Sequence, residues 1–465
     1  MMSQPLVFNG VNAVTGDYSL PPMTPDQLAA FITGQTAVEN LEELRQLRKR
    51  ATQRVLGVVE GIDATDLAQA GWGVIFPADA DPAIQEALQP LLDWRRAQAG
   101  DLFRMYQGPD GLRPGESRLA FMMRHGVGFG IADPKKMPYY LLLVGDPDAI
   151  PYDFQYGMDM ERAVGRIHFD RVQDYASYAE SVVAYEKARA AVRKRVAFFC
   201  PDHDPATRLA TKALVQPLID ALIDPPTQGE ISTHLGPDAM KSRMLHLICD
   251  PEARPDLLFS ATHGMVFPAN HPQQRTHQGA LLCQDWPGPN VWHGPITPDL
   301  YLSADDLPAQ VRFDGLIAFF FACFSNGTPR TDDFTQWAFR DRAQPIAPAP
   351  FLARLSTRML AQGALAVLGH VERAWSFSFQ WMGTTFPQTT TYESVLKALM
   401  AGKPAGLAFE YFDSLYADFT MALTQRLKLA ELEIAVDPVE LAGFWTASTD
   451  ARNFTILGDP AVRLA

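Results

Sequence analysis

Short apolar runs alternate with amphipathic stretches along most of this chain. The short runs are bounded by Gly, Pro or Asp, which is typical of strands buried on both faces. The longer stretches repeat apolar residues at three- and four-residue spacing, which predicts helices. The alternation predicts an α/β fold with a mostly parallel sheet flanked by helices on both faces. We expect strands at 139–144, 163–169, 195–200, 230–234, 256–262, 315–322 and 364–368, and helices at 175–192, 206–222, 238–249 and 351–362.

The first 106 residues follow a different pattern. Residues 37–59 predict a helix that carries both charge signs, and residues 81–106 predict a second helix. We interpret residues 1–106 as a helical accessory or docking region. We expect residues 107–192 to form a smaller α/β subdomain and residues 193–465 to form the main domain.

The charge balance narrows the classes of partner. The chain has 465 residues, with 40 Lys and Arg against 53 Asp and Glu and a net charge of −13. This balance repels nucleic-acid phosphates and anionic membrane surfaces, so we expect neither as a partner. The longest apolar run, Gly315 to Phe324, is too short to cross a bilayer, and residues 1–9 lack the pattern of a secretory signal. We therefore expect a cytoplasmic protein whose four cysteines remain thiols.

Two of the predicted strands end in residues that carry chemistry. The strand at 256–262 leads directly into His263 and Gly264, and the strand at 315–322 leads directly into Cys323. Ligands and catalytic groups of parallel sheets gather beyond the carboxyl ends of the strands. A histidine supplies an acid or base near neutral pH, a cysteine supplies a thiolate nucleophile, and glycine lets backbone N–H groups approach a carbonyl closely. These residues are sufficient for acyl transfer.

These motifs resemble the caspase–haemoglobinase superfamily (clan CD) of cysteine peptidases, and most closely its gingipain-like and CHAT-domain branches. The resemblance covers roughly residues 139–465, and Asn326 is an insertion relative to the family's Ala-Cys-x-Ser-Gly block. The motifs that carry it, in chain order, are Leu142–Pro147 with Ile150-Pro151, Val164–Ile167, Leu257–Gly264, Ile317–Gly327 and Leu457–Pro460.

The resemblance implies a caspase-like catalytic domain and a Cys-His dyad. Cys323 attacks the scissile carbonyl, His263 delivers a proton to the leaving amine, and the backbone N–H groups of Gly264 and Cys323 form the oxyanion site. The family pattern requires no third member. It also implies regulation by an activating protein partner, bacterial origin and a role in defence.

Three further residues are candidates for the substrate pocket. Phe321 lies two residues before Cys323, where relatives place a charged or amide group, so a neutral or apolar preference stays open. Asp202, which follows the strand at 195–200, is a pocket candidate or a solvated turn carboxylate. Trp375 is a pocket candidate or an ordinary core residue.

We expect no metal and no cofactor. His271, His277 and His293 lie near His263 in the sequence, but their spacings match no zinc motif. A Walker loop and an H-E-x-x-H motif are both missing. The remaining cysteines are interpreted as structural, and they are Cys200, Cys249 and Cys283.

The leading hypothesis is a cysteine endopeptidase that cleaves a protein partner at a restricted site. The second hypothesis is a catalytically silent caspase-like scaffold that binds proteins through its groove or residues 1–105. The third is an amidase that acts on a small molecule. An enclosed pocket favours the third hypothesis, whereas an open groove beside a strand edge favours proteolysis.

Overall fold

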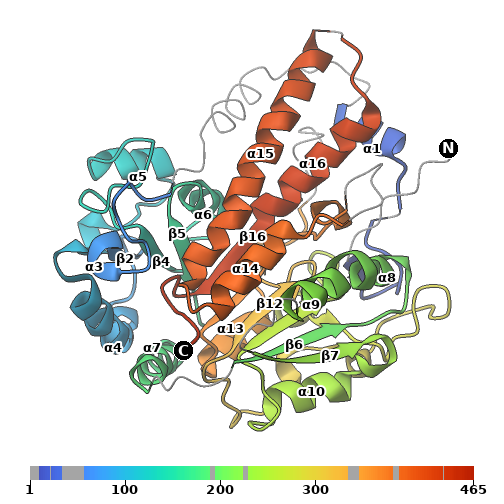
Figure 1. Ribbon diagram of the computed structural model, residues 1–465, viewed down its shortest axis with the longest axis horizontal. Helices are drawn as coiled ribbons and strands as arrows, with labels where there is room; N and C mark the ends of the chain where they lie inside the picture. Colours follow the sequence, from blue (N-terminus) through green and yellow to red (C-terminus); the bar gives the residue numbers. More distant parts are fainter. Residues whose placement is uncertain are drawn as a thin grey trace.

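The computed structural model describes most of the chain (Figure 1). The predicted helix at 37–59 falls largely outside the described residues, so its prediction stays open. The described residues are 10–20, 22–33, 57–188, 194–223, 229–332, 345–380, 387–432 and 434–465.

Within these residues, ten strands form one large sheet. Only the pairing of β15 with β16 is antiparallel, and every other neighbouring pair in this sheet is parallel. The prediction of a mostly parallel α/β sheet is therefore confirmed. The spatial order is β3 (Phe103–Tyr106), β2 (Trp72–Ile75), β4 (Tyr140–Val144), β5 (Ala163–Ile167), β16 (Phe454–Gly458), β15 (Ala366–His370), β12 (Ile317–Phe321), β8 (Leu257–Ala261), β6 (Arg195–Cys200) and β7 (Glu230–Leu235).

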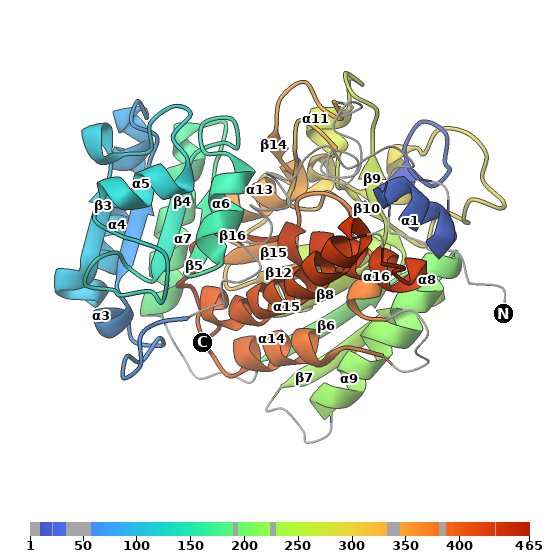
Figure 2. The same ribbon diagram turned by 90° about the horizontal axis from the view of Figure 1, so that it is seen from above.

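Helices flank this sheet, as Figure 2 shows from above. Helices α15 and α16 pack side by side near the centre of the sheet. The helices are α1 (Pro25–Thr33), α3 (Leu67–Ala70), α4 (Pro82–Ala99), α5 (Arg118–Arg124), α6 (Tyr152–Asp159), α7 (Val172–Lys187), α8 (Pro205–Ala210), α9 (Gln216–Ile223), α10 (Lys241–Cys249), α11 (Gln274–His277), α13 (Arg354–Ala361), α14 (Thr390–Met400), α15 (Ala405–Glu431) and α16 (Pro438–Asn453). Within the described residues, no helix is both long enough and apolar enough to cross a membrane.

The region expected to be helical over residues 1–106 also contains strands, which corrects that expectation. Strand β3 occupies the end of the predicted helix at 81–106, because α4 ends at Ala99 and Gly100 adopts a positive φ of 54°. Strands β2 and β3 extend the large sheet beside β4. The proposed domain boundaries stay predictions.

A second sheet lies where the chain continues beyond β8. It contains β1 (Gly10–Asn12), β9 (Gly264–Val266), β10 (Leu281–Leu282) and β11 (Tyr301–Leu302) in that order. Strand β1 pairs in parallel with β9, with Gly10 opposite Gly264. The N-terminal segment therefore lies directly beside the residue that follows His263. A smaller sheet pairs β13 (Gly327–Thr328) with β14 (Phe351–Leu352).

Candidate active site

The histidine and cysteine singled out from the sequence follow adjacent strands. Strands β8 and β12 pair in parallel, with Ala261 opposite Phe321. His263 and Cys323 each come two residues later, so continuing this register places them opposite one another at the carboxyl edge. The parallel register thus brings together two residues that are 60 positions apart.

Gly264 allows a close approach between the two strand ends. A Cβ atom at Gly264 would lie 1.8 Å from the carbonyl oxygen of Cys323 and 2.9 Å from its backbone nitrogen. Any side chain at this position would force the strand ends apart, so the contact itself requires glycine. The contact keeps the backbones of Gly264 and Cys323 together. Their role as an oxyanion site stays a prediction.

The chain turns sharply directly after Cys323. Phe324 has a φ of 57°, in the left-handed region that bulky residues avoid, at a cost of about 1–3 kcal/mol. Asn326, the insertion relative to the family motif, donates hydrogen bonds from Nδ2 to the carbonyl oxygens of Val367 at 3.0 Å and Thr455 at 2.9 Å. This asparagine therefore anchors the turn to β15 and β16.

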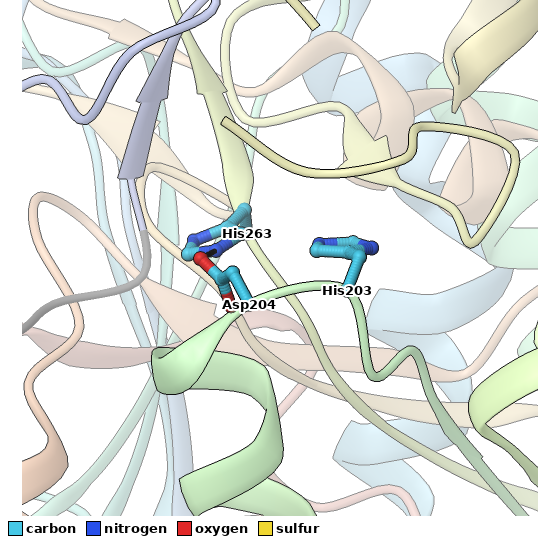
Figure 3. A group of neighbouring side chains, drawn as sticks. All are labelled: His203, Asp204 and His263. Atoms are coloured by element: carbon cyan, nitrogen blue, oxygen red, sulfur yellow. Dashed lines mark hydrogen bonds and ion pairs between the residues drawn. The ribbon is translucent and has the colours of Figure 1, made fainter. Parts of the chain in front are cut away.

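A carboxylate missed at the sequence level contacts the histidine (Figure 3). Oδ2 of Asp204 accepts a hydrogen bond from Nε2 of His263 at 2.7 Å, and both side chains are fully buried. Burial raises the pKa of Asp204, but the charge and hydrogen bond of His263 outweigh it and lower this pKa well below its ordinary value. An ionised carboxylate only accepts, so Nε2 carries the hydrogen, and Nδ1 of a neutral ring keeps its lone pair.

The position of Asp204 follows from a helix cap. Oδ1 of Asp204 accepts hydrogen bonds from the backbone nitrogen of Thr207 at 2.8 Å and from its hydroxyl at 2.7 Å. In return, the backbone nitrogen of Asp204 donates to Oγ1 of Thr207 at 3.2 Å, which completes the capping box that begins α8, and Pro205 occupies the first turn. The sequence signal was the run Asp-Pro-Ala-Thr shortly after β6. It locates a helix start at the carboxyl edge, but it does not show that the carboxylate faces His263.

Tyr18 covers the same carboxylate from the N-terminal segment. Its hydroxyl donates a hydrogen bond to Oδ2 of Asp204 at 2.6 Å, and its ring lies 5.8 Å from the ring of His263, edge to face. Burial, and then the charge of Asp204, raise the pKa of Tyr18 well above its ordinary value, so the phenol keeps its proton. The segment that pairs with β9 therefore also engages the buried Asp-His pair.

The thiol has a different environment from the histidine. Cys323 is fully buried, and its Sγ accepts a hydrogen bond from the backbone nitrogen of Ala374 at 3.2 Å. Burial raises the pKa of the Cys323 thiol to about 12, and the bond from Ala374 offsets this only in part. Among the described residues, no hydrogen bond joins Cys323 to His263. The thiol is therefore protonated at neutral pH in this closed arrangement.

The three predicted pocket residues differ in burial and in the groups they contact. Phe321 is fully buried, and its ring packs against His370 and Phe379, so it belongs to the core in this arrangement. Trp375 is 1% exposed. Asp202 is exposed, and its carboxylate lies 3.7 Å from Arg208. Their roles in substrate binding stay predictions, and the burial of Phe321 and Trp375 gives those roles no support.

A second buried Asp-His pair lies on the other side of β12. Nε2 of His370, the last residue of β15, is 3.2 Å from Oδ1 of Asp450, and both side chains are fully buried. The same oxygen accepts a hydrogen bond from the backbone nitrogen of Trp375 at 2.6 Å. The ring of His370 packs against Phe454 with a centroid separation of 3.9 Å. Sequence motifs did not indicate this pair.

One group of side chains in the described residues has the composition and spacing to hold a metal ion. Ligand atoms of His203, Asp204 and His263 lie within 4.8 Å of one another. None of the three histidines weighed for zinc from the sequence belongs to this group, and these are His271, His277 and His293.

The other three cysteines lie outside the proposed dyad. Cys200 and Cys283 are fully buried, and Cys249 is partly buried. Burial raises the pKa of the Cys200 thiol to about 12, although a hydrogen bond with Thr211 opposes this. Burial also raises the pKa values of Cys249 and Cys283. These thiols have the character of packed core groups.

Comparison with known proteins finds likenesses in structure only. No protein-family model matches the chain, and no curated protein matches it significantly. A structure described as a protease has 15% identity and a TM-score of 0.48, with 85% of this chain and 78% of that chain covered. The complex of RgpB pro- and mature domains from Porphyromonas gingivalis has 11% identity and a TM-score of 0.44, with 85% and 79% covered. The Saccharomyces cerevisiae separase–securin complex has 10% identity and a TM-score of 0.31, with 70% and 16% covered. Because these TM-scores are below 0.5, any function must be argued from the site itself.

Proposed function

We propose that this protein is a cysteine endopeptidase that cleaves a protein substrate at a restricted site through Cys323 and His263. The observation that carries the proposal is the parallel register of β8 and β12, because His263 and Cys323 each follow the last paired residues of these adjacent strands by two positions. The close approach of Gly264 to Cys323 and the hydrogen bond between Asp204 and His263 support it.

The chemistry follows from the state of each group. Nδ1 of His263 is buried without a hydrogen-bond partner among the described residues, so it is available to accept the thiol proton. The thiolate of Cys323 then forms a bond to the substrate carbonyl carbon. His263 returns the proton to the leaving amine, which leaves a thioester that water hydrolyses. Asp204 is a positioning residue, because it holds the hydrogen on Nε2 and orients the ring.

Regulation is part of the proposal. Cys323 and His263 are both fully buried, so a substrate reaches them only after the site opens. The N-terminal segment contributes β1 beside Gly264 and Tyr18 against Asp204. We assign this segment as one cover over the histidine, which an activating protein partner or a processing event displaces.

A specific observation favours the catalytically silent scaffold as the second candidate. The pKa of the Cys323 thiol is raised to about 12 by burial, and its hydrogen-bond partner is the backbone of Ala374 rather than His263. A protein that never cleaves retains such a thiol simply as a core residue. The two candidates differ in whether any condition exposes and ionises the thiol.

The deciding experiment maps new protein N-termini by mass spectrometry. A lysate is treated with the protein, and a matched lysate is treated with Cys323→Ala. The Cys200→Ala variant is the control, because it removes another buried thiol that does not belong to the proposed dyad. Candidate protein partners are added to all samples in a second series.

Endopeptidase activity requires new termini with the native protein and with Cys200→Ala, and their loss with Cys323→Ala. New termini that share the residue preceding the cut would also establish the specificity. Identical maps for the native protein and Cys323→Ala, even with partners present, would support the scaffold instead.

A further inference from the structure

We propose that His203, Asp204 and His263 form a binding site for a divalent transition-metal ion, and that Zn²⁺ is the ion it selects. A ring nitrogen from each histidine and a carboxylate oxygen lie within 4.8 Å of one another. Two imidazoles and one carboxylate are a donor set that proteins use for zinc with one position left open. Ca²⁺ and Mg²⁺ prefer oxygen ligands, so this donor set disfavours them.

His203 is the residue that the peptidase proposal leaves without a role. Both of its ring nitrogens are buried, and neither has a hydrogen-bond partner in the described residues. Its ring stacks on that of His263 with centroids 5.6 Å apart and contacts Trp286 at 4.8 Å. Buried polar atoms without a partner are costly and uncommon. A bound metal ion would satisfy one of these nitrogens.

The carboxylate of Asp204 is held in a fixed orientation, as a metal ligand requires. Its Oδ1 is fixed by Thr207 at the start of α8, so Oδ2 is presented to His263 at 2.7 Å. His203 and Asp204 come from the loop after β6, and His263 comes from the end of β8 (Figure 3). Outer contacts of this kind orient metal ligands and raise affinity. The Tyr18 hydroxyl, 2.6 Å from Oδ2, borders the open position.

Binding requires a small closure of the site. Zinc bonds of about 2.0–2.2 Å set ligand atoms roughly 3.3 Å apart, so the most distant pair here must approach by up to roughly 1.5 Å. Nε2 of His263 and Oδ2 of Asp204, which are 2.7 Å apart, must separate slightly. Rotation of the His203 side chain supplies this movement, since no hydrogen bond holds its ring. If the ion replaces the hydrogen between His263 and Asp204, Nε2 gives up its proton and Nδ1 takes one up, so that a neutral imidazole binds the ion through Nε2.

The metal and the proposed proton transfer compete for the same side chains. An ion bound to His263 and Asp204 fixes the imidazole and removes it from acid–base work. Zinc would therefore inhibit cleavage reversibly, and a chelator would restore it. This consequence rests on the proposed peptidase function, whereas metal binding itself does not.

The test uses the full chain carrying Cys323→Ala, so that the dyad thiol cannot bind the ion. The metal-free protein is titrated with ZnCl₂ by calorimetry and with CoCl₂ by visible absorption, which reports the number and geometry of bound imidazoles. We expect one ion per chain. Adding His203→Ala should weaken binding at least about 100-fold, because the loss of even an outer contact costs 10–100-fold.

His246→Ala is the matched control, because this histidine is exposed on α10 beside Asp250 and should leave binding unchanged. His203→Gln replaces His203→Ala in the titration if the alanine variant has a lowered melting temperature. The proposal is overturned if the Cys323→Ala protein binds no Zn²⁺, or if both His203 variants bind it as tightly as their parent. Zinc binding by the Cys323→Ala protein, together with no cleavage by the native protein, would retain the metal site and remove the peptidase function. Cleavage by a protein that binds no Zn²⁺ would do the reverse.

Discussion

Two buried Asp-His pairs flank β12, the strand that precedes Cys323, and they differ in what surrounds them. His263 and Asp204, on the β8 side, are joined by a 2.7 Å hydrogen bond and meet the Tyr18 hydroxyl. His370 and Asp450, on the β15 side, are 3.2 Å apart.

The surroundings indicate different tasks for the two pairs. The His370 ring is enclosed by Phe321 and Phe454, and its carboxylate partner holds the backbone of Trp375. Such a pair ties a loop to the core. Each ring has an unpartnered Nδ1 within the described residues, but only the His263 ring is hydrogen-bonded to its carboxylate and has polar neighbours, which suits the movement of a proton. An Asp-His contact alone therefore does not identify a catalytic base, since its neighbours decide its use.

The largest expected effect separates the two histidines. His263→Asn should lower kcat/KM about 10²–10⁴-fold, the usual contribution of a positioned acid or base. His370→Asn should leave kcat/KM within about threefold and lower the melting temperature instead, because the buried contact with Asp450 and the ring packing are lost. Steady-state kinetics on a cleaved peptide and thermal unfolding measure both. A reversed order would make His370 the base.

The second prediction concerns the thiol. A pKa of about 12 leaves far less thiolate at pH 8 than the ordinary value near 8.5, so alkylation of Cys323 by iodoacetamide should be about 10³-fold slower than in the unfolded chain. The rate should still rise with pH beyond 9. Mass spectrometry of the peptide containing Cys323 follows the reaction. Rapid alkylation with a plateau near pH 7 would contradict the buried, protonated thiol.

The third prediction concerns a substitution that breaks the contact between Gly264 and Cys323. Gly264→Ala should lower kcat/KM at least about 100-fold, because a displacement of the reacting groups by about 1 Å costs that much. Gly443→Ala is the control, since a Cβ there meets nothing within 4 Å. Circular dichroism must show that both variants fold. Full activity of folded Gly264→Ala would show that the close approach is dispensable.

The fourth prediction tests Asp204 as a positioning residue. Asp204→Asn should lower kcat about tenfold or more with little change in KM, because the ring of His263 loses its charged acceptor. A change in melting temperature alone, with kcat intact, would assign Asp204 to the helix cap only.

The smallest expected effect comes from the N-terminal segment. Tyr18→Phe removes one hydrogen bond to Asp204 and should destabilise the state in which the N-terminal segment covers His263 by about 1 kcal/mol. We therefore expect kcat/KM to rise about fivefold. The readout is the rate of peptide cleavage without added partners. A lower rate would instead make Tyr18 part of the active arrangement.

The sequence by itself determined the central strands and the residues that follow them. The apolar runs at 139–144, 195–200, 256–262 and 315–322 became β4, β6, β8 and β12, because continuous apolar segments bounded by breakers are buried as parallel strands. Parallel strands share a carboxyl edge, so His263 and Cys323 could be expected there together. This much depends on local pattern and on one general property of parallel sheets.

Only the tertiary structure decided what those two residues contact. Asp204 meets His263 across 59 positions, and Tyr18 meets Asp204 across 186. The pairing of β1 with β9 and the enclosure of the Cys323 thiol also depend on distant segments. Local patterns record whether a residue is buried and in which kind of element, but not which distant side chain it meets. Strand pairing and helix packing determine those partners, and the partners set the pKa of the thiol and the orientation of the imidazole.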